Sequence, residues 1–410
     1  MARAEGNDPA ASISSSFGDW VATFFQAIAF GAVAPYIYFV NDLSHPSQTV
    51  LLTSLFFVGR LIGKTIFSRF SSWGLNRPLL AVQGIMLTLA YALIAESAAL
   101  YPTGITGLRF AQVGWFLVGL LGSHLFLRKS YFKAEKRFSM IDFDLLGISI
   151  GAALSSALTW GIVRSPVRWA LMDAFVPSIV AAGLSAIAVG VLLMSRRHMV
   201  AFENESLHKC GSVSAIIICA VAVPCALGPM MLWESFGFRP CEVALMIANA
   251  GLLAVAVQII VRRALDRSGS ATLCRWVIAI GLCSLFVSAN ALSWSPNTGS
   301  GIVLCTGIAL LSIGWGCLRP MLSDVNGNSD GFGFTLDARV WLVAWLCGMM
   351  LGASLFYYHE RTSFASSGLV IVVAAFMIWK REIDKACTSA PVEQAAQTET
   401  TRESAASLFP

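Results

Sequence analysis

Charged side chains are scarce in this chain of 410 residues. Lys, Arg, Asp and Glu make up 12% of it and hydrophobic residues make up 56%, with a mean hydropathy of +0.71. Ordinary soluble domains are about 25% charged, so a water-soluble globule of this length could not cover its surface. A chain surrounded by lipid needs no such cover, and we therefore predict an integral membrane protein.

Motifs for metal, redox and catalytic chemistry are also missing. All ten cysteines lie between Cys210 and Cys387, no Cys-x-x-Cys pair occurs, and most cysteines fall in apolar runs, where they act as small apolar residues. No Walker, GxSxG, HExxH or GxGxxG sequence stands in a usable loop, and no polar stretch could form a domain that binds ATP. We expect no enzyme activity, no catalytic residue, no metal and no cofactor.

Long apolar runs are what the sequence has in abundance. A membrane-spanning helix needs about 20 mostly apolar residues, and twelve such runs can be counted. The polar segments 1–16 and 381–410 are expected to be disordered cytoplasmic tails. The predicted spans start near Phe17, Thr49, Pro78, Gly104, Phe138, Leu171, Val213, Glu242, Leu273, Gly301, Ala338 and Phe364.

The positions of the 28 Lys and Arg residues predict the orientation of the spans. If the N-terminus is cytoplasmic, most of them fall in cytoplasmic loops and tails, with the densest cluster at 128–137. We therefore predict a multi-pass protein of the bacterial inner membrane with both termini cytoplasmic. The net charge of +5 lies in short clusters, not on one face, which argues against a nucleic-acid partner. The basic residues on the outer side would be Arg109, Arg164, Arg168, Arg239 and Arg361.

The twelve spans divide into two similar halves. The loops FSRFSSWGLNRPLL and VRRALDRSGSATLC each follow the second span of a group of six, and a polar stretch joins the two groups. We predict an all-α fold of two pseudo-symmetric six-helix bundles, 17–195 and 213–380, joined by a cytoplasmic linker at 196–212. An axis along the membrane normal would relate the bundles.

This organisation resembles the major facilitator superfamily of secondary transporters over almost the whole length between the tails. The loop signature of that family, G-x-x-x-D-R-x-G-R-R, is partly retained after span 8 as Asp266, Arg267 and Gly269, whereas Ser72 replaces the aspartate after span 2. The resemblance implies that this loop is a cytoplasmic gate that latches the two halves together. The alternative is an ordinary solvated turn.

A second resemblance lies in span 4. Many family members carry R-x-x-Q-G-x-G there, and this chain has Arg109 and Gln112, with Val113 in place of the first glycine. The resemblance implies that Arg109 binds or moves protons, or holds an anionic substrate group. The alternative is that Arg109 reaches the nearby membrane interface. Gln112 lies one turn away on the same face and has no interface to reach, which favours a role in the cavity.

Other candidates for the substrate or proton pathway lie in further spans. Many exporters of this family carry an aspartate at a fixed distance before the proline of span 1, and Gln26 occupies that position here. It cannot titrate, but it can hydrogen-bond substrate or another helix. Arg60, inside span 2, needs a countercharge, for which we expect Asp19. The family fold lines its central cavity with spans 1, 4, 7 and 10, which adds Trp233 and Glu234.

Span 5 reads LLGISIGAALSSALTWG and is rich in small residues. Antiporters of the family often combine a glycine-rich fifth span with a proline, which is missing here. Gly147 and Gly151 therefore predict close packing of this helix against a neighbour, as small residues allow in membranes.

The first functional hypothesis is proton-coupled export of a small organic molecule, such as a drug, siderophore or secondary metabolite, by alternating access. The alternative is uptake of a small metabolite or organic anion, with Arg60 and Arg109 as substrate ligands. A third is a non-transporting relative that assists assembly of a membrane complex. We expect a monomer powered by an ion gradient, whose partners are its substrate and the lipid bilayer.

Overall fold

The computed structural model describes residues 21–22, 24–38, 46–69, 77–99, 105–126, 143–163, 172–194, 212–268, 270–323, 338–358 and 362–380. Within these ranges the chain is helical apart from short connections, and contains no strand. The first helical segment, Phe24–Tyr36, ends in the 3-10 helix η1 (Ala34–Tyr38), and the last helix is Thr362–Lys380. Between them lie α2 (Pro46–Arg69), α3 (Arg77–Ala99), α4 (Ile105–Phe126), α5 (Phe143–Val163), α6 (Met172–Met194), α7 (Ser212–Glu234), α8 (Pro240–Ser268), α9 (Ala271–Thr298), α10 (Gly301–Ser323) and α11 (Ala338–Tyr358).

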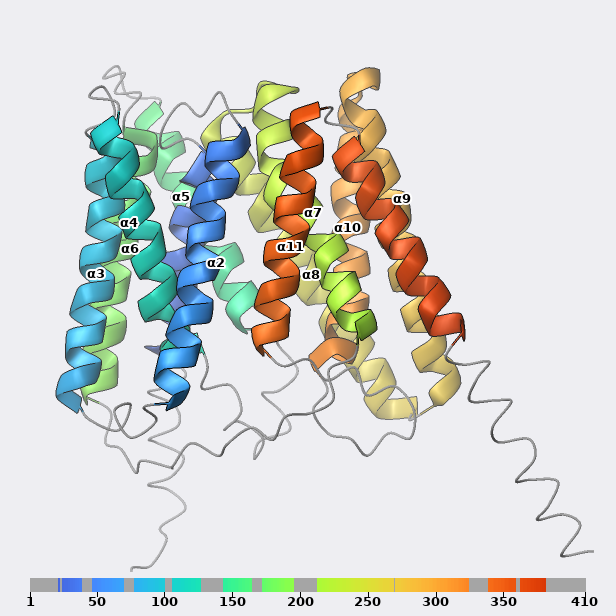
Figure 1. Cartoon of the computed structure of the whole chain (residues 1–410), viewed down its shortest axis with the longest axis horizontal. Helices are drawn as coiled ribbons and strands as arrows, with labels where there is room; N and C mark the ends of the chain where they lie inside the picture. Colours follow the sequence, from blue (N-terminus) through green and yellow to red (C-terminus); the bar gives the residue numbers. More distant parts are fainter. Residues whose placement is uncertain are drawn as a thin grey trace, which may run out of the picture.

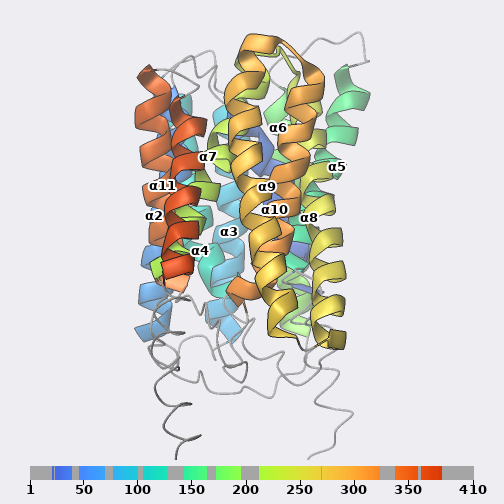
Figure 2. The same ribbon diagram turned by 90° about the vertical axis from the view of Figure 1, so that its right-hand side faces the viewer.

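The helices run side by side in two groups, the first helix to α6 and α7 to the last helix (Figure 1). Successive helices alternate in direction, so α9 ends at the same end of the molecule at which α10 begins (Figure 2). The predicted all-α fold of twelve helices in two bundles is confirmed. Described helix starts lie within a few residues of the predicted ones, except that the fifth, predicted near Phe138, is described from Phe143. The two predicted tails, the start at Phe17 and nearly all of the linker lie outside the described residues.

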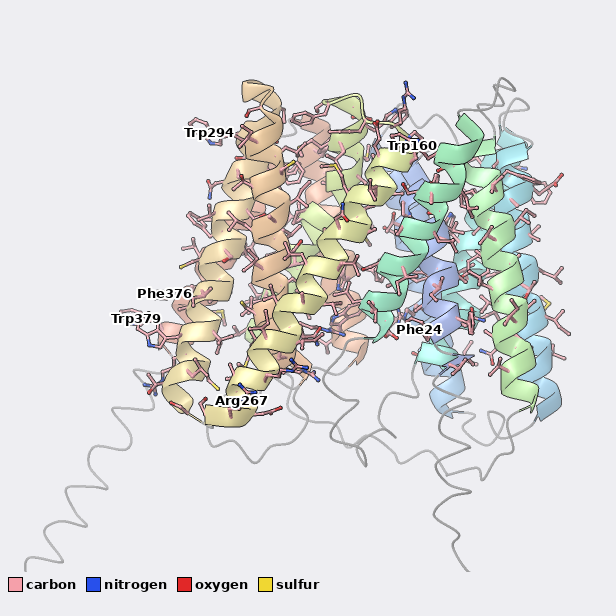
Figure 3. All side chains as sticks on the ribbon, turned by 180° about the vertical axis from the view of Figure 1, so that it is seen from behind. Phe24, Trp160, Arg267, Trp294, Phe376 and Trp379 are labelled. Carbon is pink, nitrogen blue, oxygen red and sulfur yellow. The ribbon has the colours of Figure 1, made fainter. Side chains whose placement is uncertain are left out.

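Apolar side chains cover the outside of the helix bundle. Five of the described helices are long and apolar enough to cross a membrane, α7 among them. Trp160 and Trp294 lie near one end of the bundle (Figure 3). Trp379 lies nearer the other end, and Arg267 lies farther toward that end than Trp379. Trp294 is 66% exposed and Trp379 60% exposed, as expected for aromatic rings at the two membrane interfaces. The chain is a multi-pass membrane protein. Following the orientation predicted from the basic residues, we call the end with Arg267 the inner end and the opposite end the outer end.

Glycines let the first helix and α5 approach closely. A Cβ on Gly151 would collide with the carbonyl oxygen of Ile28 and would lie 2.7 Å from the backbone nitrogen of Ala32. A Cβ on Gly147 would lie 2.6 Å from the Cβ of Ala27. The geometry agrees with the close packing predicted for Gly147 and Gly151, because only a residue without a side chain fits where two backbones touch.

The same kind of packing recurs in the second half. Gly119 of α4 lies against the backbone of α2, and Gly316 of α10 lies against the backbone of α8. Gly151 of α5 packs on the first helix, and Gly348 of α11 packs on α7. Gly119 and Gly316 are separated by the same number of residues as Gly151 and Gly348. The helix crossings of the two halves therefore correspond.

Two seams join the halves, one between α5 and α8 and the other between α2 and α11. On the α5–α8 seam, the hydroxyl of Ser156 donates a hydrogen bond to the carbonyl oxygen of Cys241 at 2.7 Å. At the outer end, η1 also packs against α7 and α8, where Tyr36 shares a buried cluster with Val243 and Ala244. The halves therefore meet at the outer end around η1 as well as along the two seams.

Candidate functional site

Gln26 points into the N-terminal half. It is 1% exposed, and its Nε2 donates hydrogen bonds to the hydroxyl of Ser185 on α6 at 3.0 Å and to the carbonyl oxygen of the same residue at 3.4 Å. Thr88 of α3 donates to the same hydroxyl at 3.5 Å. Gln26 Oε1 has no hydrogen-bond partner among the described residues. This geometry favours a hydrogen bond between helices over a substrate contact for Gln26.

Arg109 and Gln112 lie near the outer end of α4. The buried side of this helix, with Ala111 and Trp115, packs against α2 and α3. Arg109 is exposed, Val113 one turn later is 50% exposed, and Gln112 is half-buried. Arg109 therefore faces away from the helices on which α4 packs, and its predicted role in the cavity stays a prediction.

Trp233 and Glu234 are the last residues of α7. The chain turns directly after them, because Gly237 adopts a φ of 65° and its N–H donates to the carbonyl oxygen of Trp233 at 3.0 Å. Trp233 is half-buried, and Glu234 is exposed at the outer end. Their predicted place in the pathway is thus at the outer end of the bundle, far from its centre.

The predicted cytoplasmic gate differs in its local structure from the expected loop. Asp266 and Arg267 lie in the last turn of α8, which continues to Ser268, and α9 begins at Ala271. Both side chains are exposed. Gly269, one of the two residues between these helices, lies outside the described residues, and so does Asp19. The role of these residues as a latch stays a prediction.

Arg60 lies on the α2–α11 seam between the two halves. Its guanidinium carbon is 6.0 Å from the centre of the Trp341 ring, within the range of a cation–π interaction. Phe57, one turn earlier on α2, stacks on Trp345 with ring centroids 5.6 Å apart and an interplanar angle of 8°. One face of α2 therefore places a cation and an aromatic ring against two tryptophans of α11.

Aromatic contacts continue from this seam into the N-terminal half. Phe57 lies 5.2 Å from Phe56, which stacks on Phe30 of the first helix at 4.8 Å. The ring of Phe56 also meets Trp115 of α4 edge-on at 6.2 Å. The aromatic side chains thus connect the core of one half with α11 of the other half.

The charges that act on Arg60 come from two further helices. Asp144, at the start of α5, attracts the guanidinium, and Arg319, near the inner end of α10, repels it. Asp144 is thus a carboxylate whose charge acts on Arg60, while the expected partner, Asp19, lies outside the described residues.

The middle of α7 has a narrow open face. Cys225 is exposed, on a helix that is otherwise mostly buried. Gly228, one turn later, has no atom within 4 Å of the position that a Cβ would take. The residues beside them, such as Ala222 and Leu227, are fully buried. Since most of α7 is buried inside the protein, we interpret this open face as part of the wall of an internal space.

The sequence analysis did not find Trp341 and Trp345, because it searched the helices expected to line the cavity and not α11. A signal was present. Trp341 and Trp345 are four residues apart, as are Trp315 and Arg319, so each pair lies on one face of its helix. In the structure Arg319 lies 5.7 Å from the centre of the Trp315 ring. An arginine inside a span, such as Arg60, also requires partners.

Solved structures with the same fold are transporters. A point mutant of the nucleoside transporter NupG matches with a TM-score of 0.62 and 11% identity, over 89% of this chain and 99% of that one. A bacterial homologue of the human lysosomal transporter Spinster, inward-facing and occupied, matches with a TM-score of 0.59 and 14% identity, over 91% and 97%. The inward-open xylose transporter XylE from E. coli matches with a TM-score of 0.57 and 15% identity, over 90% and 95%. No protein-family profile and no curated sequence matches the chain.

Proposed function

Because the chain has the fold of the major facilitator superfamily, we propose that it is a secondary active transporter that moves a small organic molecule across the membrane by alternating access. Two bundles that rock about a site between them would expose that site to each side in turn. The proposal includes a monomer without a cofactor, driven by an ion gradient.

The distribution of contacts between the halves is the observation that carries this proposal. The halves meet along the α5–α8 and α2–α11 seams and at the outer end around η1. The open face of α7 lies at Cys225 and Gly228, and Arg60 lies on the α2–α11 seam against Trp341. Two halves that meet along two seams and at one end suit a carrier, which opens to one side at a time.

We propose export as the direction and protons as the coupling ion, with Arg109 and Gln112 in the pathway. Gln26 cannot titrate, so a transported proton would use a carboxylate such as Asp144 or Glu234. Export predicts that a strain lacking the chain retains more of some small molecule than a strain producing it, as mass spectrometry of cell extracts would measure. In inside-out vesicles with an acidic lumen, that molecule should raise the lumenal pH. A compound that accumulates only in the producing strain would instead indicate uptake.

The open face of α7 gives a prediction for the transport pathway. Gly228→Leu should lower the transport rate about tenfold, equivalent to about 1.4 kcal/mol in the barrier, because the leucine would enter the pathway. It should leave the melting temperature unchanged, because no atom lies within 4 Å of a Cβ at this position. Gly183→Leu on α6 is the matched control, since Gly183 is exposed and equally free of neighbours. Equal transport rates for the two variants would mean that the open face of α7 is not on the pathway.

A further inference from the structure

Two prolines interrupt the backbone hydrogen bonds of α7. Pro224 and Pro229 both lie inside this helix. A proline has no N–H, so the carbonyl oxygen four residues before it loses its usual helical donor. In α7 these are the carbonyl oxygens of Ala220 and Cys225. Within a membrane, such a carbonyl oxygen needs another partner, which a neighbouring side chain or a polar cavity can supply.

A serine hydroxyl satisfies the first of these two carbonyl oxygens. Ser367, on the last helix, donates to the carbonyl oxygen of Ala220 at 2.8 Å. Pro296 of α9 has a similar arrangement, because Ser295 donates to the carbonyl oxygen of Leu292 at 2.9 Å. At both prolines, a side chain of the protein thus replaces the missing N–H.

The carbonyl oxygen of Cys225 differs from the other two. No side chain among the described residues donates a hydrogen bond to it. The residue that bears this oxygen lies on the open face of α7, where Cys225 is exposed and no atom lies within 4 Å of a Cβ on Gly228. A group that enters the space beside α7 would therefore meet an acceptor to which no described side chain donates.

The open face of α7 lies opposite its contact with α11. Cβ atoms on Gly348 and Gly352 of α11 would lie against Cys219 and Val223 of α7. These two residues are four apart and share one face of the helix, and Cys225 lies on the other side. Because α7 also contacts α2 and η1 of the N-terminal half, this position agrees with an internal space between the halves.

The chemistry of a carbonyl oxygen defines the group that suits it. The oxygen accepts hydrogen bonds and cannot donate them, so an ammonium, amide or hydroxyl group is a fitting partner. A carboxylate would bring a negative charge and further acceptors against it, so the position disfavours organic anions. Beside it, Ala222 and Leu227 are buried and apolar, which leaves the carbonyl as the polar group of this stretch of α7.

A bend in α7 explains only part of this arrangement. Either proline would bend or weaken the helix. A bend does not require that one of the two carbonyl oxygens stay without a side-chain donor on the open face, when the other is bonded to Ser367.

We propose that the carbonyl oxygen of Cys225 accepts a hydrogen bond from an N–H or O–H group of the transported molecule. This names the chemical class of the cargo, a compound that carries an amine, amide or hydroxyl donor, and it rests on the proposed function for movement across the membrane. Recognition of the donor itself can be measured without any transport.

Two thiol reagents that differ in their N–H donors test the proposal at the native Cys225. Its thiolate attacks the thiol sulfur of a methanethiosulfonate, forms a disulfide and releases methanesulfinate. The 2-aminoethyl reagent carries an ammonium group with N–H donors, whereas the 2-(trimethylammonio)ethyl reagent has the same charge and no N–H. Relative to their rates with 2-mercaptoethanol, we expect the aminoethyl reagent to modify Cys225 about tenfold faster, because a charge-assisted hydrogen bond holds it beside the thiol.

The full chain in nanodiscs is used, and mass spectrometry of the peptide that contains Cys225 measures both rates. Pro229→Ala supplies an N–H that can bond to the Cys225 carbonyl oxygen inside the helix, so it should abolish the preference between the reagents. The size of the reagents alone would give the same preference in this variant as in the native chain. Pro224→Ala is the matched control and should keep the preference, because Ser367 already satisfies the carbonyl oxygen concerned.

A glycine at position 229 separates the acceptor from a bend. Pro229→Gly also supplies the N–H but leaves the backbone easy to bend, so it should lose the preference as Pro229→Ala does. A native preference in Pro229→Gly that is missing in Pro229→Ala would assign the effect to bending and overturn the proposal.

Three further outcomes overturn the proposal. They are equal normalised rates for the two reagents, an unchanged preference in folded Pro229→Ala, and no modification of Cys225 by either reagent. Failure of the proposed function has a different result. If the preference is present and Pro229→Ala abolishes it, but no compound crosses the membrane of proteoliposomes, the site stands and transport is wrong. If a compound is transported equally by the native chain and by Pro229→Ala, transport stands and the carbonyl site is wrong.

Discussion

Replacing Gly151 by valine is expected to prevent stable folding of the N-terminal half. The new Cβ would collide with the Ile28 carbonyl oxygen and would lie 2.9 Å from the carbonyl carbon of Gly31. These are backbone atoms, which cannot rotate away, so the first helix and α5 would have to separate. Overpacking of a core costs about 1–3 kcal/mol or more, and we expect a value at or above the top of that range.

Thermal unfolding and the yield of monodisperse protein after extraction from membranes measure this effect. Gly183→Val is the control, because it makes the same substitution in the same half at a site where no atom lies within 4 Å of the Cβ. Gly348→Val should resemble Gly151→Val, since its Cβ would collide with the Cys219 carbonyl oxygen in the corresponding helix pair. A Gly151→Val protein as stable as the Gly183→Val protein would contradict the close helix packing.

A disulfide between Ser149→Cys and Gly251→Cys is expected to stop transport reversibly. A Cβ on Gly251 would lie 3.2 Å from the Cβ of Ser149, just below the usual range of about 3.5–4.5 Å in disulfides. The bond would join α5 of one half to α8 of the other. Rocking requires these helices to move against each other, so the oxidised protein should transport about tenfold more slowly or not at all, a barrier increase of about 1.4 kcal/mol or more.

Transport in proteoliposomes before and after oxidation, and again after reduction with dithiothreitol, measures this effect, while mass spectrometry confirms the cross-link. Each single variant under the same oxidant controls for the eight native cysteines among the described residues. Full transport by protein whose cross-link is complete would show that the α5–α8 seam does not move during the cycle.

The sequence predicted the number of helices and their grouping, because apolar runs of membrane length are unmistakable in a chain with so few charges. It did not predict which face of each helix is buried. Helices such as α7 are apolar on all sides, so periodicity does not distinguish a core face from a lipid face. Gln26 illustrates the limit. Its position suggested the pathway, but its contact is with Ser185 inside the N-terminal half.

Charge partners were equally hard to predict. Arg60 requires a countercharge, and which acidic residue supplies it depends on how the helices around α2 sit in three dimensions; the expected partner, Asp19, lies outside the described residues. The end of α8 shows a second limit. Asp266 and Arg267 form a plausible loop in sequence, yet polar residues beyond the membrane can extend a helix by a turn, as they do here.

The indole N–H groups of Trp341 and Trp345, which have no acceptor within the described chain, also suggest how a natural ligand could be identified. A compound that binds the folded protein and not the unfolded one stabilises it by mass action, by about 2.7 kcal/mol at one hundred times its Kd. A library of metabolites could therefore be ranked by the heat resistance that each confers on the purified chain. Such a ranking requires no vesicles, no radiolabel and no assumption about which way the cargo travels.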